Sequence, residues 1–158
     1  MIKLNYSSIS SLARLCDKAA STWMNALNVG RCRVDLLATS VNVANVIINF
    51  GRVDRSTSPT RIAQHEIRDG IHHITLASDI KWQISAWQRF MGIGQENAYA
   101  ALLHEFGHAL GFPHSNEFSD VMNAECGSTV ISADEAEGYR IFFDQASHPL
   151  TLRPDSKA

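Results

Sequence analysis

The sequence predicts an α/β fold, because five β-type runs are interleaved with three segments of helical periodicity. The β-type runs either alternate apolar and polar residues or are rich in Val, Ile and Leu. They are residues 1–6, 32–38, 43–50, 61–67 and 71–77. In the helical segments apolar residues recur every three or four positions. These are residues 8–27, 95–110 and 132–145.

The first and last helices have clear boundary signals. The apolar stripe of residues 8–27 runs for about five turns, after which Asn28 and Gly30 favour a stop. Before the last helix, Ser132 and Glu135 have the spacing of a capping box.

The final two strands are expected to form a hairpin, because Asp69-Gly70 between them is a strong turn signal. Residues 51–60 are rich in Gly, Ser, Pro and Asp and are expected to be a loop. Residues 79–94 are predicted to be an irregular connection.

The composition is that of a globular protein. The 158 residues are 45% hydrophobic and 19% charged, with a net charge of −2. There is no basic stripe for nucleic acid, and no apolar run approaches the roughly 20 residues that span a bilayer. We therefore expect one domain over residues 1–145, a flexible tail over 146–158, no nucleic-acid or membrane partner, and a monomer.

The cysteines and the N-terminus leave the compartment open. Cys16, Cys32 and Cys126 match no zinc-ribbon or disulfide framework, so three separate thiols are expected. The first residues, MIKLNYSSIS, lack the apolar region of a secretory signal.

The segment HEFGHALGFPH, residues 104–114, carries the chemistry. His104 and His108 are four residues apart on a predicted helix and therefore share one face, where both can bind one Zn²⁺. Gly111 lets the chain leave the helix in a left-handed conformation, so that His114 can return as the third ligand. Three histidine ligands leave one coordination position open, which is typical of a catalytic zinc site.

Glu105 is the predicted general base. It is adjacent to the first ligand and can accept a proton from a zinc-activated water, then deliver it to the leaving amine. The alternative is three histidines at a solvated helix end. The extended pattern arises by chance in only on the order of 1 in 10⁵ chains of this length, which favours the zinc site.

These motifs resemble the metzincin metallopeptidases, and the matrixin family in particular. Met122 lies eight residues after His114, the spacing of the family's Met-turn; by itself it could equally be a core methionine. Residues 44–51 and 131–138 resemble a matrixin strand and the family's final helix, and Trp23 lies where its first helix ends. The resemblance implies a twisted five-stranded mixed sheet with one antiparallel edge strand, two long helices, a C-terminal helix and a Met-turn under the zinc. It also implies secretion.

The sequence departs from the family in its accessory metal sites. Matrixins hold a structural zinc and calcium ions in a long loop, whereas residues 51–60 are short and lack the ligand runs. With a turn at Arg68-Asp69-Gly70, His65 would lie opposite His73, and His72 is close by. One alternative is a structural metal here, because the family places ligands on these two strands, but the remaining ligands are not evident. We expect exposed or hydrogen-bonded histidines, so a single catalytic Zn²⁺ is predicted, without structural zinc or calcium. His148, in the tail, is a poor ligand candidate.

The family's specificity wall also differs. After Met122 matrixins often continue Pro-x-Tyr, which walls the main specificity pocket and favours a large apolar residue after the cut. This chain continues Asn123-Ala124-Glu125-Cys126-Gly127, so that preference is less secure than the reaction.

We therefore predict a zinc-dependent endopeptidase acting on a protein or peptide substrate. The strand at 61–67 would be the sheet edge above the cleft, where an extended peptide can pair with the backbone of Ile62, Ala63, Gln64 and His65. Two alternatives are a zinc-containing peptide-binding domain of the same fold with weak or no catalysis, and a zinc hydrolase of non-peptide amides. Glu105 argues against the first alternative, because a binding module needs no general base.

Overall fold

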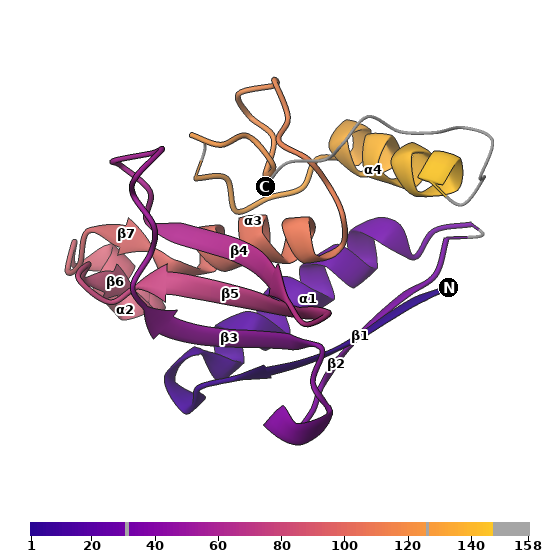
Figure 1. Ribbon diagram of the computed structural model, residues 1–158. Helices are drawn as coiled ribbons and strands as arrows, with labels where there is room; N and C mark the ends of the chain where they lie inside the picture. The colour runs from indigo at the N-terminus through magenta and orange to yellow at the C-terminus, as the bar shows by residue number, and fades with distance from the viewer. Residues whose placement is uncertain (31, 126, 147–158) are drawn as a thin grey trace.

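The computed structural model describes residues 1–30, 32–125 and 127–146, and its centre is a five-stranded sheet (Figure 1). The strand order is β2-β1-β3-β5-β4. The strands are β1 (Ile2–Ser8), β2 (Val34–Ala38), β3 (Val46–Gly51), β4 (Ala63–Arg68) and β5 (Ile71–Ala77). All neighbouring pairs are parallel except β4 and β5, which are antiparallel and leave β4 at one edge. The expected mixed sheet is therefore confirmed.

Two long helices pack against each other and against the sheet, α1 on β1 and β2 and α3 on β4 and β5. A third helix, α4, packs on α1. Their bounds are α1 (Ala13–Leu27), α3 (Ala98–Ala109) and α4 (Ala133–Ala146). The first helix begins later than expected, because the chain completes β1 at Ser8 and makes a 3₁₀ turn, η1 (Ser10–Leu12), before it.

Trp23, near the end of α1, ties the two long helices together. Its indole is fully buried, and its Nε1 donates to the carbonyl oxygen of Leu103 at 2.8 Å. The ring stacks on Phe112 with 5.3 Å between centroids. Since Leu103 precedes the first histidine of the motif, this contact fixes α3 where the site is built.

The connection expected to be irregular is partly ordered, so that prediction was wrong in part. It contains α2 (Ala86–Phe90) and β6 (Trp82–Gln83), which pairs with β7 (Glu96–Asn97). Ser85 and Gln88 form a complete capping box at the start of α2. That spacing of Ser and Gln was readable in the sequence.

The hairpin between β4 and β5 has a two-residue turn, Asp69-Gly70, with φ of 52° and 77°. Arg68 belongs to the strand and pairs directly across the hairpin. The expectation that His65 lies opposite His73 is therefore wrong, because counting Arg68 in the turn shifts the register by one residue. His65 lies opposite Ile74.

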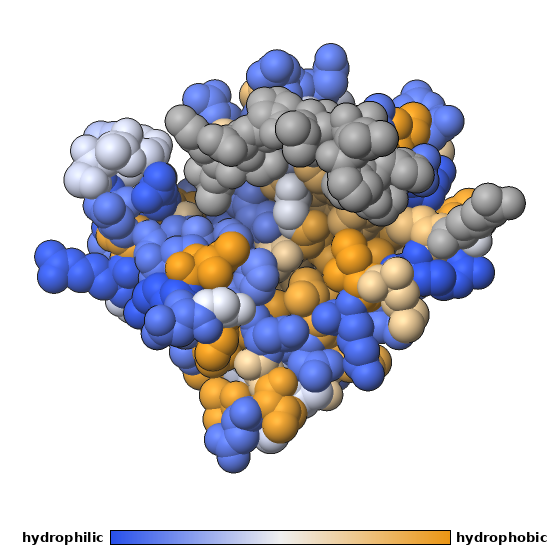
Figure 2. Space-filling model, turned by 45° about the vertical axis from the view of Figure 1, so that its right-hand side comes forward, coloured by the Kyte–Doolittle hydropathy of each residue, from blue (hydrophilic) through white to orange (hydrophobic). Residues whose placement is uncertain are grey.

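The surface shown in Figure 2 mixes hydrophilic and hydrophobic side chains. Hydrophobic atoms are exposed at its lower tip, at the height where Figure 1 places the turn η2 (Val41–Val43) between β2 and β3. Val41 and Val43 are more than half exposed there. No helix within the described ranges has the length and apolarity needed to cross a bilayer.

Cys16 is buried and Cys32 partly exposed, and both are free thiols as expected. The predictions for Cys126, for His148 and for a flexible tail concern residues 126 and 147–158, outside the described residues; the tail's first residue, Ala146, instead ends α4.

Candidate active site and metal centre

Helix α3 places two of the predicted ligands on one face. His104 and His108 are four residues apart, hence about one turn apart along the helix. The N-cap of the helix is Asn97, whose Oδ1 accepts hydrogen bonds from the backbone N–H groups of Tyr99 and Ala100. The helix predicted over 95–110 is confirmed, with its first residue at Ala98.

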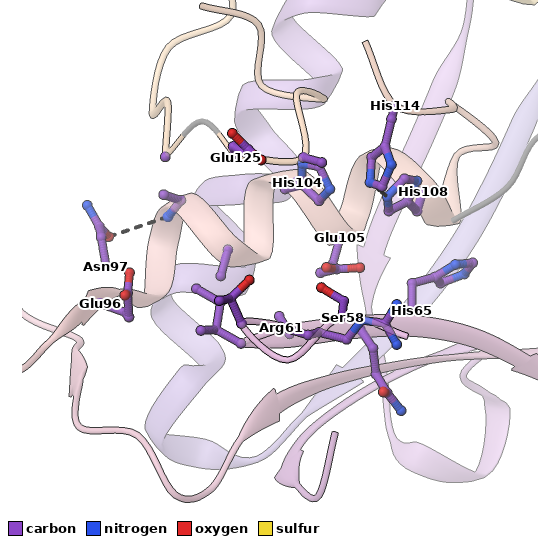
Figure 3. A pocket seen from close by; sticks show the side chains of 18 of the residues that line it. Ser58, Arg61, His65, Glu96, Asn97, His104, Glu105, His108, His114 and Glu125 are labelled. Atoms are coloured by element: carbon purple, nitrogen blue, oxygen red, sulfur yellow. Dashed lines mark hydrogen bonds between the residues drawn. The ribbon is translucent and has the colours of Figure 1, made fainter. Parts of the chain in front are cut away.

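Gly111 ends this helix and returns the chain toward it. Its φ is 98°, a left-handed conformation that a side chain would disfavour, as the sequence predicts. The N–H of Phe112 donates to the carbonyl oxygen of Gly107 at 3.0 Å, which closes the helix end. His114 follows three residues after Gly111 and faces His108 (Figure 3).

The three histidines form one cluster. One ligand atom from each of His104, His108 and His114 lies within 4.8 Å of the others. The Nε2 atoms of His108 and His114 are 3.1 Å apart. Two nitrogens bound to one tetrahedral zinc at about 2.05 Å each would be roughly 3.3 Å apart, so the spacing fits that ion.

Hydrogen bonds on the far side of two rings fix which nitrogen faces the cluster. Nδ1 of His104 donates to the carbonyl oxygen of Val121 at 2.7 Å, and Nδ1 of His108 donates to that of Phe112 at 2.8 Å. Because a carbonyl oxygen can only accept, these Nδ1 atoms carry the protons and Nε2 keeps its lone pair for a metal.

The electrostatics favour neutral imidazoles. Burial lowers the pKa of His104 and of His114. Burial, together with the neighbouring His104, lowers the pKa of His108 to about 3. A metal binds the unprotonated ring, so little proton release is needed near neutral pH.

Glu105 is a buried carboxyl group in the same cavity. It is 5% exposed, and its Oε2 has no hydrogen-bond partner among the described residues. Burial raises the pKa of Glu105 to about 8, and the guanidinium of Arg61 opposes this shift. In Figure 3 its carboxyl group points away from α3 into the space between the helix and the edge strand.

Met122 lies directly behind the two helical histidines. It is fully buried, and its Sδ would be 2.2 Å from a Cβ placed on Gly107, between His104 and His108. It lies within a turn, in which the N–H of Asn123 donates to the carbonyl oxygen of Asp120 at 3.0 Å. Met122 is thus buried in the core and also lies in a tight turn beside the cluster, so both interpretations of this residue describe its position.

A cavity of about 650 Å³ joins these groups to the sheet edge. All four residues expected to face substrate, Ile62, Ala63, Gln64 and His65, line this cavity together with the three histidines and Glu105. Ile62 lies one residue before β4 rather than within it.

Apart from the cluster of three, His65 and His72 form a pair of histidines on the hairpin of β4 and β5. They are diagonal neighbours on one face of the hairpin, and His65 Nε2 is 2.7 Å from His72 Nδ1. The His65 ring also lies parallel to that of His108, with 6.1 Å between centroids. We expected the hairpin histidines to be exposed or hydrogen-bonded, and His65 and His72 are hydrogen-bonded to each other. Among the described residues the cluster at His104 is the only grouping of three potential ligands, so the number of metal ions stays a prediction.

Sequence reasoning missed several residues at the site. Arg61, Glu96 and Glu125 line the cavity, and Gly107 makes the close approach to Met122. The three charged residues carried no motif. Gly107 occupies a variable position of the zinc motif, and only the fold reveals what it faces.

Two comparisons with known proteins bear on this site. A family model described as Matrixin matches residues 6–140, which is most of the chain. Matrix metalloproteinase-A of Caenorhabditis elegans is 26% identical over 121 residues, covering 74% of this chain and 22% of that protein. The chain therefore spans less than a quarter of the length of this relative.

Proposed function

Because the chain belongs to the matrixin family, we propose that it is a zinc-dependent endopeptidase with Glu105 as its general base. The family is one of metalloproteases and implies zinc. The role of Glu105 as general base rests on its buried carboxyl group, whose Oε2 has no hydrogen-bond partner among the described residues and which shares a cavity with the three histidines. A general base for water attack needs this combination of proximity and a free acceptor atom.

His104, His108 and His114 would hold the zinc ion through Nε2. When bound, the ion supplies Lewis-acid chemistry, lowering the pKa of water and polarising the scissile carbonyl. Glu105 accepts the proton of the attacking water and passes it to the nitrogen of the leaving amine. Burial raises the pKa of Glu105, which makes the carboxyl group a stronger base and helps it hold this proton between the two steps.

The edge strand supplies the place for the substrate backbone. Among the described residues β4 pairs only with β5, and its other side can therefore hydrogen-bond an extended peptide, a common mode of peptide recognition. Ala63, Gln64 and His65 lie on β4 where it lines the cavity, so a peptide there would pass between the edge strand and the zinc ligands.

The main alternative remains a zinc-containing peptide-binding domain with weak or no catalysis. Glu105 weighs against it, because a buried carboxyl group whose Oε2 has no partner in the described part of the chain costs stability, and peptide binding alone needs no general base.

Cleavage of casein by the zinc-loaded protein tests the proposal. We expect cleavage that a chelator or a hydroxamate abolishes, and one zinc per chain by elemental analysis. A protein that binds the peptide but never cuts it would favour the binding domain. A protein that hydrolyses only non-peptide amides would favour the alternative of a zinc hydrolase of non-peptide amides. Two zinc ions per chain would overturn the prediction of a single ion.

We propose further that residues 1–145 act as one domain, that the chain is a monomer of 17.5 kDa in solution, and that it acts outside the cell. Matrixins are typically secreted, which supports the last point. Size-exclusion chromatography and cell fractionation test these proposals.

A further inference from the structure

We propose that the cleft selects substrates with a lysine or arginine side chain next to the scissile bond, in a subsite between Glu96 and Glu125. This inference rests on the proposed peptidase function and names its substrate class. It departs from the large apolar residue that the family resemblance implies.

The subsite lies along α3 on the N-terminal side of the zinc ligands. Asn97, Ala100, Ala101 and His104 are spaced on one helix face, and all four line the cavity. Because the two alanine side chains end at Cβ, space remains beside the helix for a long side chain. The aliphatic stem of lysine or arginine can pack on this apolar floor.

Two carboxylates, those of Glu96 and Glu125, flank this apolar surface. Glu96 immediately precedes the N-cap residue of α3, and Glu125 lies on the segment that follows the Met-turn; Figure 3 shows them on two different segments around the start of α3. Glu96 is half-buried and Glu125 exposed. Neither forms an ion pair with any residue in the described ranges.

The charge of the whole cavity has the same sign. Besides Glu105, the described residues that line it carry four carboxylates, those of Asp54, Glu66, Glu96 and Glu125, against one guanidinium, that of Arg61. Arg61 donates from Nη1 to the backbone carbonyl oxygen of Asp54 at 2.8 Å, its charge acts on Glu105, and it forms no ion pair with Glu96 or Glu125. Of these carboxylates, only that of Glu66 forms an ion pair with a described residue, Arg68 of the hairpin, at 3.2 Å.

A bound zinc ion would not offset this charge. With Glu105 counted, five carboxylates among the described lining residues face the two positive charges of a zinc ion and the one of Arg61. A basic substrate side chain would pair with Glu96 and Glu125, whereas an apolar one would desolvate them without compensation.

The test compares three peptides that differ only at the residue beside the cut, which carries lysine, its uncharged analogue norleucine, or glutamate. For the zinc-loaded protein we expect kcat/KM for the lysine peptide to exceed that for the norleucine peptide by about fivefold or more, and the glutamate peptide to be poorest. Mass spectrometry of the products locates the cut.

Charge-removing variants assign the effect to the two carboxylates. Glu96→Gln and Glu125→Gln should each reduce the lysine preference, the double variant should abolish it, and salt should weaken it in the wild-type protein. Glu137→Gln is the matched control, because Glu137 is exposed on α4 and does not line the cavity. It should leave the preference unchanged.

Binding of the same peptides to the zinc-loaded Glu105→Ala protein, followed by fluorescence anisotropy, separates this inference from the peptidase function. Tighter binding of the lysine peptide that Glu96→Gln and Glu125→Gln remove supports the subsite even if nothing is cleaved. Equal binding or cleavage of the lysine and norleucine peptides, a preference that survives the double variant, or no binding of either peptide overturns the inference.

Discussion

At the scale of single residues, Gly107 sets how closely α3 approaches the Met-turn. A Cβ at this position would lie 2.2 Å from Sδ of Met122 and 2.8 Å from Cζ2 of Trp23. Both neighbours are fully buried, so neither has free space to move into. The absence of a side chain here is therefore a packing requirement of the site.

Replacing Gly107 with alanine should destabilise the protein by about 1–3 kcal/mol, the usual cost of overpacking a core. Urea unfolding of the wild-type and variant proteins measures the difference. Gly138→Ala is the matched control, because a Cβ at Gly138 on α4 meets nothing within 4 Å. It should be neutral or stabilising by up to about 1 kcal/mol. A Gly107→Ala protein as stable as the wild type would contradict the packing argument.

The same residue marks how far sequence reasoning reaches at this scale. His104, Glu105, His108, Gly111 and His114 were predictable, because their chemistry depends on local spacing along one helix and its exit. The role of Gly107 was not, since Trp23 and Met122 come from distant parts of the chain and only tertiary packing brings them to it.

At the scale of elements, α4 supports the Met-turn through Glu135. Its carboxylate accepts hydrogen bonds from the N–H of Val121 at 2.7 Å and from the hydroxyl of Tyr139. The carbonyl oxygen of Val121 in turn accepts from His104. A chain of hydrogen bonds therefore runs from α4 to His104, the first of the proposed zinc ligands.

The pH dependence of stability tests this support. Burial raises the pKa of Glu135 above its ordinary 4.5, although its hydrogen bonds act against the shift. A raised pKa in the folded state means that the native protein holds the proton of Glu135 more tightly than the unfolded chain does. The resulting contribution to the free energy of unfolding is fully present below about pH 4.5 and is lost as the pH rises through the pKa of the folded state. Glu135→Gln cannot ionise, so the stability of the wild type relative to this variant should fall between about pH 4 and pH 7. Urea unfolding across that range measures the difference.

The control for this experiment is Glu137→Gln, an exposed position on the same helix. Its stability difference from the wild type should stay nearly constant over the range. A wild-type protein that gains stability relative to Glu135→Gln as the pH rises would contradict the account of Glu135.

The loop between β3 and β4 is held by charge. The Arg55 guanidinium donates two hydrogen bonds to the Asp79 carboxylate, at 2.7 and 2.9 Å, and its Nε donates to the carbonyl oxygen of Arg61 at 2.9 Å. These contacts place Arg61 beside the cavity.

Arg55→Gln should free this loop and make subtilisin cut within residues 52–61 faster than in the wild type. Arg68→Gln, which removes only the exposed hairpin pair with Glu66, should leave the cleavage rate in that loop unchanged. Equal rates for Arg55→Gln and the wild type would show that the loop is held by other contacts.

Elements were easier to predict than their pairing. The five strands of the sheet, the three long helices and the capping box before α4 followed from periodicity, because those signals are local. The hairpin register was wrong by one residue. Asp69-Gly70 is long enough by itself to reverse the chain, and assigning Arg68 to the turn put His73 rather than Ile74 opposite His65.

At the scale of the whole molecule, a bound zinc would join parts of the chain that are otherwise connected through one glycine turn. His104 and His108 belong to α3, and His114 belongs to the segment after Gly111. Binding restricted to the folded state stabilises it, by about 2.7 kcal/mol at a free zinc concentration 100 times the dissociation constant.

We therefore expect the urea midpoint to rise with free zinc and to fall when a chelator removes it. The His114→Ala protein, which lacks the ligand outside α3, should show a much smaller response. A wild-type midpoint independent of zinc would contradict a metal site in the folded protein.

The most direct test of the central claim is the turnover of a cleavable peptide by the Glu105→Ala protein with its zinc content measured on the same sample. We predict one zinc per chain, as in the wild type, and a loss of about 10²–10⁴-fold in kcat, the range typical of removing a general base. A fully zinc-loaded Glu105→Ala protein that cleaves the peptide at the wild-type rate would contradict the proposed mechanism.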